Sequence, residues 1–242
     1  MATFTNKMLL VLAASVLLPL TCLGQTIPPD KDWSADLTVY MLAPGMSGNT
    51  TVHGVDADLN VSFSDIWHNL QFGGMARPTV HYRRWAVSTD VVYMGLGAVK
   101  NDVDLAYDQW LVEPVVQYQL TPWLSPYAGA RYMSLKGDIR GPQGRTGTGK
   151  QSWWDPVVGA DLRVPLSSKF AVRVHGDVGG FGAGSSFSGQ IEPMLDWRLG
   201  KVVSLQFGYR WLYADYKTGS GTNLFRYDML TQGPQFGGVF HF

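Results

Sequence analysis

Residues 186–199 have the sequence SFSGQIEPMLDWRL, and residues 203–213 have the sequence VSLQFGYRWLY. In both stretches the side chains alternate between apolar and polar types, so that residues such as Leu195 share one face and residues such as Glu192 share the other. Alternation with a period of two is typical of a β-strand whose two faces meet different surroundings. The connection between the stretches is short and begins with Gly200. The two stretches therefore predict an antiparallel hairpin.

The same alternation recurs along most of the chain, whereas the spacing of an amphipathic helix is nearly absent. The ten alternating segments are 33–43, 70–82, 85–97, 104–119, 126–137, 152–165, 169–179, 186–199, 203–216 and 227–242. Short connections such as Arg83-Arg84 alternate with long polar ones such as residues 136–151, KGDIRGPQGRTGTGKQ. This layout predicts an all-β fold, a single transmembrane antiparallel β-barrel of ten strands, with eight as the alternative. Short turns would face the periplasm and longer loops the exterior.

The beginning of the chain predicts export. Residues 1–24 contain Lys7, an apolar run and small residues before a cut after Gly24, which is the pattern of a cleaved Sec-type signal peptide. Residues 25–32 then form an N-terminal periplasmic lead, and residues 33–242 form the barrel. The one cysteine, Cys22, lies in the signal, so the mature chain has no disulfide to hold it together. The chain has 19 basic and 19 acidic residues, so it lacks the positive field of a nucleic-acid-binding protein.

Proline recurs at intervals of roughly 40 residues, once on every second segment. The five positions are Pro78, Pro114, Pro156, Pro193 and Pro234. A strand proline gives up a ladder hydrogen bond, so we interpret these residues as outward-facing marks of a bulge or bend. The residue before each proline then faces the lumen.

Most of those inward residues are charged, and each of the three acids among them is followed by an arginine at a fixed distance along the chain. The pattern predicts four ion pairs: Glu113–Arg131, Asp155–Arg173, Glu192–Arg210 and, with the signs exchanged, Arg77–Asp90. Asp36 adds an inward acid on the first segment. The predicted lumen charge belt therefore consists of Asp36, Arg77, Asp90, Glu113, Arg131, Asp155, Arg173, Glu192 and Arg210. Such a belt either fills and stiffens a narrow barrel or acts as the selectivity zone of a pore, and we favour filling.

The opposite face carries large aromatic residues near the strand ends. They include Trp85, Tyr118, Trp123, Trp153, Trp154, Trp197, Trp211 and Tyr213. Amphipathic rings at two heights are typical of the aromatic girdles of a membrane barrel. The same alternation would also suit a soluble, lipocalin-like periplasmic binder if the aromatic face pointed inward.

The last strand ends in Phe236, Phe240 and Phe242, with no polar residue after them. A final strand of alternating hydrophobic residues that ends in phenylalanine resembles the assembly signal of Gram-negative outer-membrane β-barrel proteins. The strands YAGARYM (127–133) and QFGYRWL (206–212) are also similar to those of small members of that superfamily. The resemblance implies a location in the outer membrane, contact with outer-membrane lipid, and recognition of the last strand by the barrel-assembly machinery.

His175 and Asp177 share the inward face of one segment and form a candidate acid–base pair. Without a nucleophile motif, a structural role is the more common outcome for such a pair. The acids and histidines of the first loop, residues 44–69, match no metal signature, and we expect neither a metal nor a cofactor. The sequence thus favours a non-enzymatic outer-membrane protein, structural or weakly conducting for small solutes. The alternatives are an outer-membrane hydrolase of lipid or peptide with a site at the rim, and the soluble binder.

Overall fold

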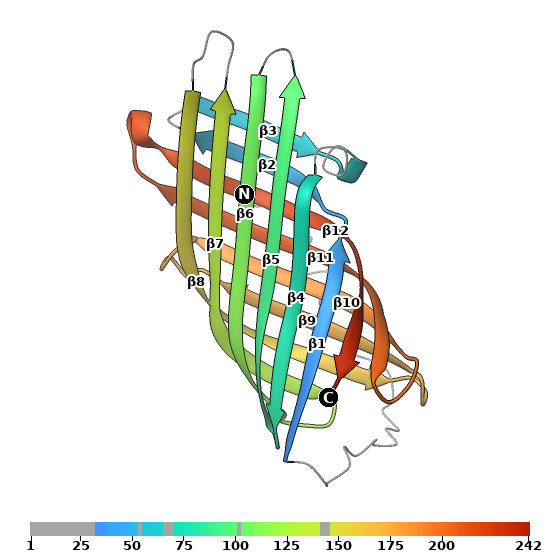
Figure 1. The fold of residues 1–242 in the computed structure, drawn as a ribbon. Helices are drawn as coiled ribbons and strands as arrows, with labels where there is room; N and C mark the ends of the chain where they lie inside the picture. The colour runs from blue at the N-terminus through green and yellow to red at the C-terminus, as the bar shows by residue number, and fades with distance from the viewer. Residues whose placement is uncertain (1–31, 53–54, 65–69, 101–102, 141–145) are drawn as a thin grey trace.

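Ten antiparallel strands form one closed barrel in the computed structural model, which describes residues 32–52, 55–64, 70–100, 103–140 and 146–242 (Figure 1). The barrel strands are β1 (Trp33–Leu42), β4 (Leu70–Tyr82), β5 (Trp85–Lys100), β6 (Val103–Tyr118), β7 (Leu124–Arg140), β8 (Thr146–Pro165), β9 (Phe170–Gly179), β10 (Phe187–Arg198), β11 (Val203–Thr218) and β12 (Phe225–His241). Each pairs with its neighbour in the sequence, and β12 closes the barrel against β1. The expected all-β barrel of ten strands is confirmed, and the alternative of eight is wrong. The predicted signal peptide and all but the last residue of the predicted lead lie outside the described residues.

The first loop contains two strands that the sequence analysis missed. They are β2 (Gly45–Val52) and β3 (Val55–Val61). The pairs Leu42↔Gln235 and Gly45↔Gln232 belong to one register, so β1 and β2 follow β12 as one long strand that is interrupted only at residues 43–44. Strand β3 folds back on β2. The alternation of this stretch is weak because many of its residues are small or polar, so the pattern alone predicted a loop.

The recurring prolines do not mark bulges, contrary to the sequence-based interpretation. The β4–β5 register is the same on both sides of Pro78, as the pairs Ala76↔Val91 and Thr79↔Ser88 show, so no extra residue is inserted. Each proline does lie on the outward face. The strand beside the proline adapts with a glycine instead: a Cβ added to Gly129 would lie 2.1 Å from the carbonyl oxygen of Pro114.

The upper part of the barrel, towards the long loops, has an apolar interior. Strands β4–β8 form a steep front layer, and β11, β12, β2 and β3 cross behind them (Figure 1). Apolar side chains fill the space between the layers: Met46, Met94, Met133, Leu135, Trp153, Ala214, Tyr227 and Met229. The sequence predicted an inward face that is polar throughout. The structure instead has an apolar layer on the inward face at this level.

Trp153 corrects one of the predicted girdle positions. Its side chain points inward, with 5% of the residue exposed, whereas the neighbouring Trp154 faces outward with 54% exposed. Strands β9 and β10 are short, and above them the ring of Trp153 on β8 stacks on the ring of Tyr216 on β11 with centroids 4.1 Å apart. This contact joins β8 to β11 inside the barrel, above the short hairpin.

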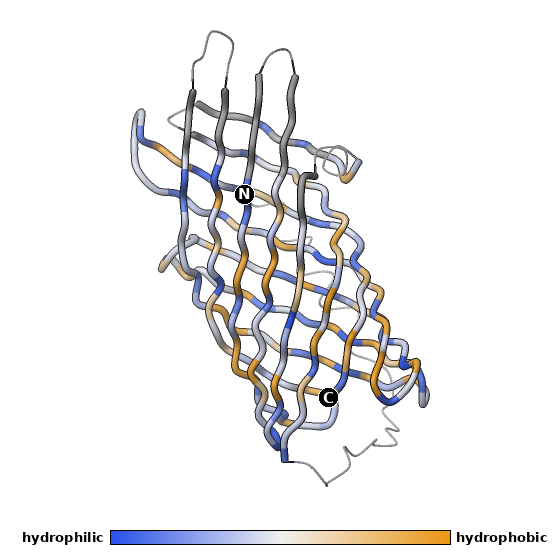
Figure 2. The backbone as a smooth tube through the Cα atoms, in the orientation of Figure 1, coloured by the Kyte–Doolittle hydropathy of each residue, from blue (hydrophilic) through white to orange (hydrophobic). Residues whose placement is uncertain are grey.

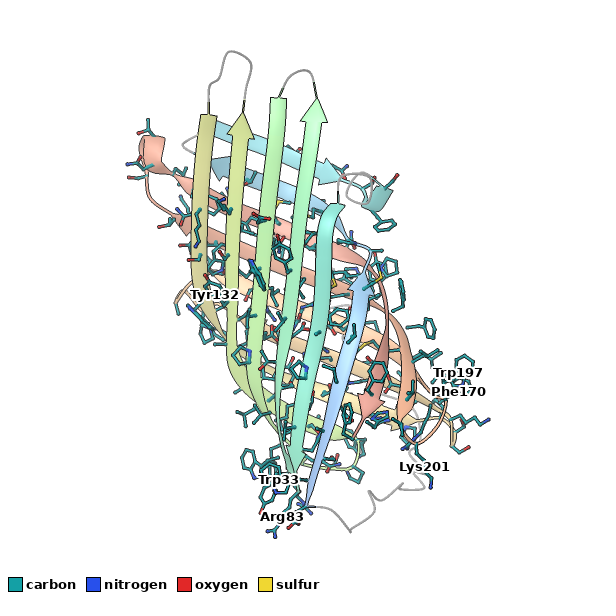
Figure 3. All side chains as sticks on the ribbon, viewed as in Figure 1. Trp33, Arg83, Tyr132, Phe170, Trp197 and Lys201 are labelled. Atoms are coloured by element: carbon teal, nitrogen blue, oxygen red, sulfur yellow. The ribbon has the colours of Figure 1, made fainter. Side chains whose placement is uncertain are left out.

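The outward face carries large exposed apolar residues on every side of the barrel, and the hydropathy of the chain alternates along its strands (Figure 2). Near the short turns, Phe170 and Trp197 lie side by side on β9 and β10 (Figure 3). A soluble barrel would bury such residues and expose its charges, and here the arrangement is the reverse. The fold is thus that of a membrane barrel, and the lipocalin-like alternative is wrong. Among the described residues, no helix is long and apolar enough to cross a membrane.

The short-turn end is where the first strand begins, and Figure 3 places Trp33 and Arg83 there. In the turn between β4 and β5, the Arg83 guanidinium donates to the Asp32 carboxylate at 3.1 Å, and this hydrogen bond and the negative charge raise the pKa of Arg83. Asp32 is the last residue of the predicted lead. This pair therefore connects the beginning of β1 to the first turn.

Candidate functional site: the buried charge belt

Three of the four predicted ion pairs form across neighbouring strands. Arg131 Nε lies 2.5 Å from Glu113 Oε2, and Arg77 Nη2 lies 3.0 Å from Asp90 Oδ2. The third pair joins Glu192 and Arg210, with Oε1 and Nε 3.0 Å apart. These pairs form because the centre of each hairpin lies midway between the two charged residues, which puts the partners on the same rung. We keep the name charge belt for these six residues together with the groups that contact them.

The pairs are joined into one network by residues that reach across the lumen. Arg77 contacts Glu192 as well as Asp90, at 3.0 Å in both cases, and Arg210 Nη1 lies 3.0 Å from Asp90 Oδ2. Tyr40 on β1 donates its hydroxyl proton to Asp90 at 2.7 Å. One half of the belt thus holds two arginines, two carboxylates and a tyrosine, with every charge facing an opposite one.

Gln190 on β10 connects the two halves of the belt. Its side-chain oxygen accepts from Arg210 Nη2 at 2.7 Å. Its side-chain nitrogen donates to Glu113 at 2.9 Å and to Asp177 at 2.7 Å. Arg131 also donates to Asp177, at 2.7 Å. The whole network spans the lumen, and both Arg131 and Glu192 have 0% of their surface exposed.

The predicted pair Asp155–Arg173 is wrong. Arg173 binds Asp161 instead, with Nη2 2.6 Å from Oδ2. The β8–β9 ladder pairs Arg163 with Arg173 and ends at Val157, so Asp155 lies beyond the top of β9. The turn of this hairpin comes later in the sequence than the assumed repeat requires, and Arg173 is displaced towards the short turns.

Asp155 binds the connection at the top of the β9–β10 hairpin. It accepts hydrogen bonds from the backbone nitrogen of Ser185 at 2.6 Å and from its hydroxyl at 2.8 Å, and one from Trp153 Nε1 at 3.3 Å. Ser185 lies in the connection between β9 and β10 and is fully buried. Asp155 therefore fixes that connection to the wall and takes no part in the charge belt.

Asp36 also lies apart from the charge belt, near the short-turn end. It is flanked by two histidines: His241 Nδ1 is 2.7 Å from its Oδ1, and His81 Nε2 is 3.1 Å from its Oδ2. His241 Nε2 is in turn 2.9 Å from Ser204 Oγ. We call Asp36, His81, Ser204 and His241 the mouth cluster. Of these four residues only Asp36 was predicted to be part of a site, and its assignment to the charge belt is wrong.

His175 and Asp177 both belong to the buried network. His175 Nε2 is 2.8 Å from the hydroxyl of Tyr127, the two rings stack, and Nδ1 is 3.3 Å from Asp161 Oδ2. Both ring nitrogens therefore have partners. The hydroxyl of Ser185 is directed to Asp155, so it gives His175 no nucleophile. This environment does not resemble an open rim site.

One cluster in the described part of the chain has the donors for a metal ion. Ligand atoms of Glu113, His175 and Asp177 lie within 4.8 Å of one another. The guanidinium of Arg131 already contacts both carboxylates, and Gln190 donates to both as well. The positive charge of the Arg131 guanidinium thus takes the place that a metal ion would occupy between the carboxylates, so these residues do not fit a metal.

The lumen around the charge belt is nearly full. A cavity of about 30 Å³ lies on the long-loop side, between residues such as Met75, Leu111 and Arg210. A second of about 10 Å³ lies on the short-turn side, beside Arg77 and Gln235. Spaces of this size hold about one water molecule each, not a passing solute. On the long-loop side, the apolar cluster around Met133 and Trp153 fills the lumen.

Sequence reasoning missed four residues of the network: Tyr40, Tyr127, Asp161 and Gln190. All four occupy inward positions of the alternation, so their facing was predictable. Their partners were not, because Tyr40, Tyr127 and Gln190 contact strands far apart in the sequence, and the partner of Asp161 depends on where the β8–β9 turn lies. Gln190 contacts Glu113, for example, 77 positions away.

Comparisons with known proteins support the fold only. No family model and no curated protein sequence matches the chain. Among solved structures, the outer membrane protease OmpT from Escherichia coli superposes with a TM-score of 0.54 at 9% identity, over 90% of this chain and 99% of that one. The attachment invasion locus protein Ail of Yersinia pestis gives 0.42 at 9% identity, over 88% and 99%, and Neisserial surface protein A gives 0.34 at 8%, over 87% and 97%. The superposition on OmpT shows that the chain has the fold of the Gram-negative outer-membrane β-barrels.

Proposed function

We propose that this protein is a non-conducting barrel of the Gram-negative outer membrane, a structural scaffold that holds its long hairpins at the cell surface. The observation that carries the proposal is the filled lumen. The charge belt spans it at mid-height, and the apolar layer spans it towards the long loops. A pore would need a continuous polar path wider than the cavities beside Arg77 and Arg210.

The direction of insertion follows from the same proposal. The predicted signal peptide directs export, the short turns face the periplasm, and β5–β8 project their long connections outward. The apolar outer face contacts membrane lipid, and the last strand is the part that the barrel-assembly machinery recognises. Neither the belt pair His175–Asp177 nor Ser185 supports the alternative of a hydrolase at the outer rim, so we assign the belt no catalysis.

Single-channel recording tests the proposal. The refolded protein, shown to be folded by its heat-modifiable migration in gels, is added to a planar bilayer. We expect no discrete current steps from the wild type. Steps that change size in Arg131→Gln but not in Arg163→Gln, whose guanidinium is largely exposed, would identify the belt as a filter and overturn the proposal.

A further inference from the structure

We propose that Ser204, His241 and Asp36 form a nucleophilic site that hydrolyses small water-soluble carboxylic esters at the periplasmic mouth of the barrel. This activity goes beyond the structural role proposed above and lies outside the charge belt. It rests on the mouth cluster, where the imidazole of His241 lies between Ser204 and Asp36. Ser204 Oγ is 2.9 Å from His241 Nε2, and His241 Nδ1 is 2.7 Å from Asp36 Oδ1.

The ring atoms of His241 are in the order that nucleophilic catalysis requires. Nδ1 faces the carboxylate, so in the neutral tautomer its N–H donates to Asp36. Nε2 then carries the lone pair, and it faces the hydroxyl of Ser204. A hydroxyl hydrogen-bonded to a base that a carboxylate orients is the arrangement of Ser–His–Asp hydrolases, which recurs on unrelated folds.

The three groups stand on adjacent strands, which holds them in place. Asp36 on β1 and His241 on β12 form a directly opposed pair of the ladder that closes the barrel. The backbone of His241 also donates to Val202 O at 2.8 Å, beside β11, which carries Ser204. On the other side, His81 of β4 contacts the second carboxylate oxygen of Asp36 and restrains its rotation. Sites on paired strands keep their geometry better than sites on loops.

The cluster is open to water on one side, unlike the charge belt. The side chains of His241 and Asp36 are 28% and 30% exposed, whereas Ser204 itself is mostly covered. All three face the lumen near the short turns. The barrel wall separates them from the acyl chains of the bilayer, so a substrate arrives from the aqueous periplasm. The nearly closed lumen above restricts it to a small ester.

Ester hydrolysis at this site needs only the three side chains and water. Ser204 Oγ attacks the ester carbonyl while His241 Nε2 takes the hydroxyl proton and Asp36 stabilises the imidazolium. Collapse of the tetrahedral intermediate breaks the carbon–oxygen bond of the ester, and His241 returns the proton to the departing alcohol. A water molecule then attacks the acyl-serine, again through His241, and releases the carboxylic acid and free Ser204.

A second interpretation is that the mouth cluster only ties the first and last strands together. Labelling with a fluorophosphonate separates the two, because this reagent forms a covalent bond only with an activated serine. The folded wild-type protein in detergent should gain one adduct, which peptide mapping places on Ser204. No adduct, or an adduct at another residue, would refute the proposal.

Variants give a quantitative version of this test. His241→Gln should lower the labelling rate about 100-fold, within the usual range for a general base, and should remove turnover of p-nitrophenyl acetate. Ser88→Ala removes another buried serine of the inward face and should label at the wild-type rate. An unchanged rate in His241→Gln would overturn the proposal. The adduct site of the wild type decides the question without any variant, should His241→Gln not fold.

Discussion

Individual residues of the charge belt are balanced against several partners, so the loss of one charge should cost more than one contact. Arg131 faces two carboxylates, Glu113 and Asp177, at 0% exposure. In Arg131→Met both acids stay buried without a guanidinium, and we expect the free energy of unfolding to fall by about 3–5 kcal/mol. Urea-induced unfolding in lipid vesicles, followed by tryptophan fluorescence, measures it.

The control for this prediction is Arg163→Met. The side chain of Arg163 is 62% exposed and lies 3.8 Å from Asp196. Its removal should change the stability by less than about 0.5 kcal/mol. If the two variants were equally stable, the belt would not be the buried, tightly coupled network that the structure shows.

The direction of a side chain could be predicted at this scale, but its partner often could not. A period of two settles which residues face inward, and Glu113 and Gln190 both follow it. Which inward residues of two neighbouring strands lie opposite each other is decided by the position of the turn between the strands. The pairing of Asp155 with Arg173 failed because the turn at 166–169 is centred later than the assumed repeat.

Among the elements, the β8–β9 hairpin offers the sharpest test of register. A double-mutant cycle of Arg173→Met with Asp161→Asn should show a coupling free energy of about 0.5–3 kcal/mol, because these side chains form an ion pair. The cycle of Arg173→Met with Asp155→Asn should be additive within about 0.5 kcal/mol. Coupling to Asp155 in place of Asp161 would mean that the hairpin is paired in another register.

The match of proline and glycine on adjacent strands predicts where a single methyl group is not tolerated. A Cβ on Gly129 would come within 2.1 Å of Pro114 O, which is backbone and cannot move aside easily. Gly129→Ala should therefore cost about 1–3 kcal/mol of stability. Gly137, on the same strand, has nothing within 4 Å of such a Cβ, so Gly137→Ala should be close to neutral. Chemical unfolding of both variants side by side tests this, and equal stabilities would contradict the contact.

Element boundaries were predictable wherever the alternation was strong. Segment 70–82 coincides with β4, and segments 169–179 and 203–216 differ from β9 and β11 by one or two residues at an end. Strands β2 and β3 were missed because their sequence, GMSGNTTV and VDADLNV, alternates weakly. Their existence depends on the exposed edge of β12, which only the closed barrel provides.

For the whole molecule, the backbone of Phe242 extends the ladder that closes β12 against β1. The backbone nitrogen of Phe242 donates to Ala35 O at 2.9 Å, and 71% of the residue is exposed. Phe242→Ser keeps the backbone bond and removes only the outward ring. We expect less protein to insert into the outer membrane in cells, while refolding in detergent stays close to normal. Separated outer membranes, probed for heat-modifiable protein, give the measurement, and wild-type levels would show that the ring is no assembly signal.

The interior as a whole combines two kinds of filling that the sequence pattern did not distinguish. Both lie on the inward face, since Met133 follows Arg131 and Leu111 precedes Glu113 by two positions. The charges were recognised as inward because they cannot face lipid. The apolar inward residues were hidden, because an apolar side chain suits either face of a membrane barrel. Only the crossing of the two layers identifies them as a core.

The pairing of β12 with β1 has a further consequence for synthesis. A polypeptide that stops before β12 leaves one edge of β1 and one edge of β11 without a neighbouring strand, so it is not a smaller barrel but an open sheet with two free edges. Such a fragment would pair with other incomplete copies or be degraded. Strand β1 therefore has both of its neighbours only once β12 has been made.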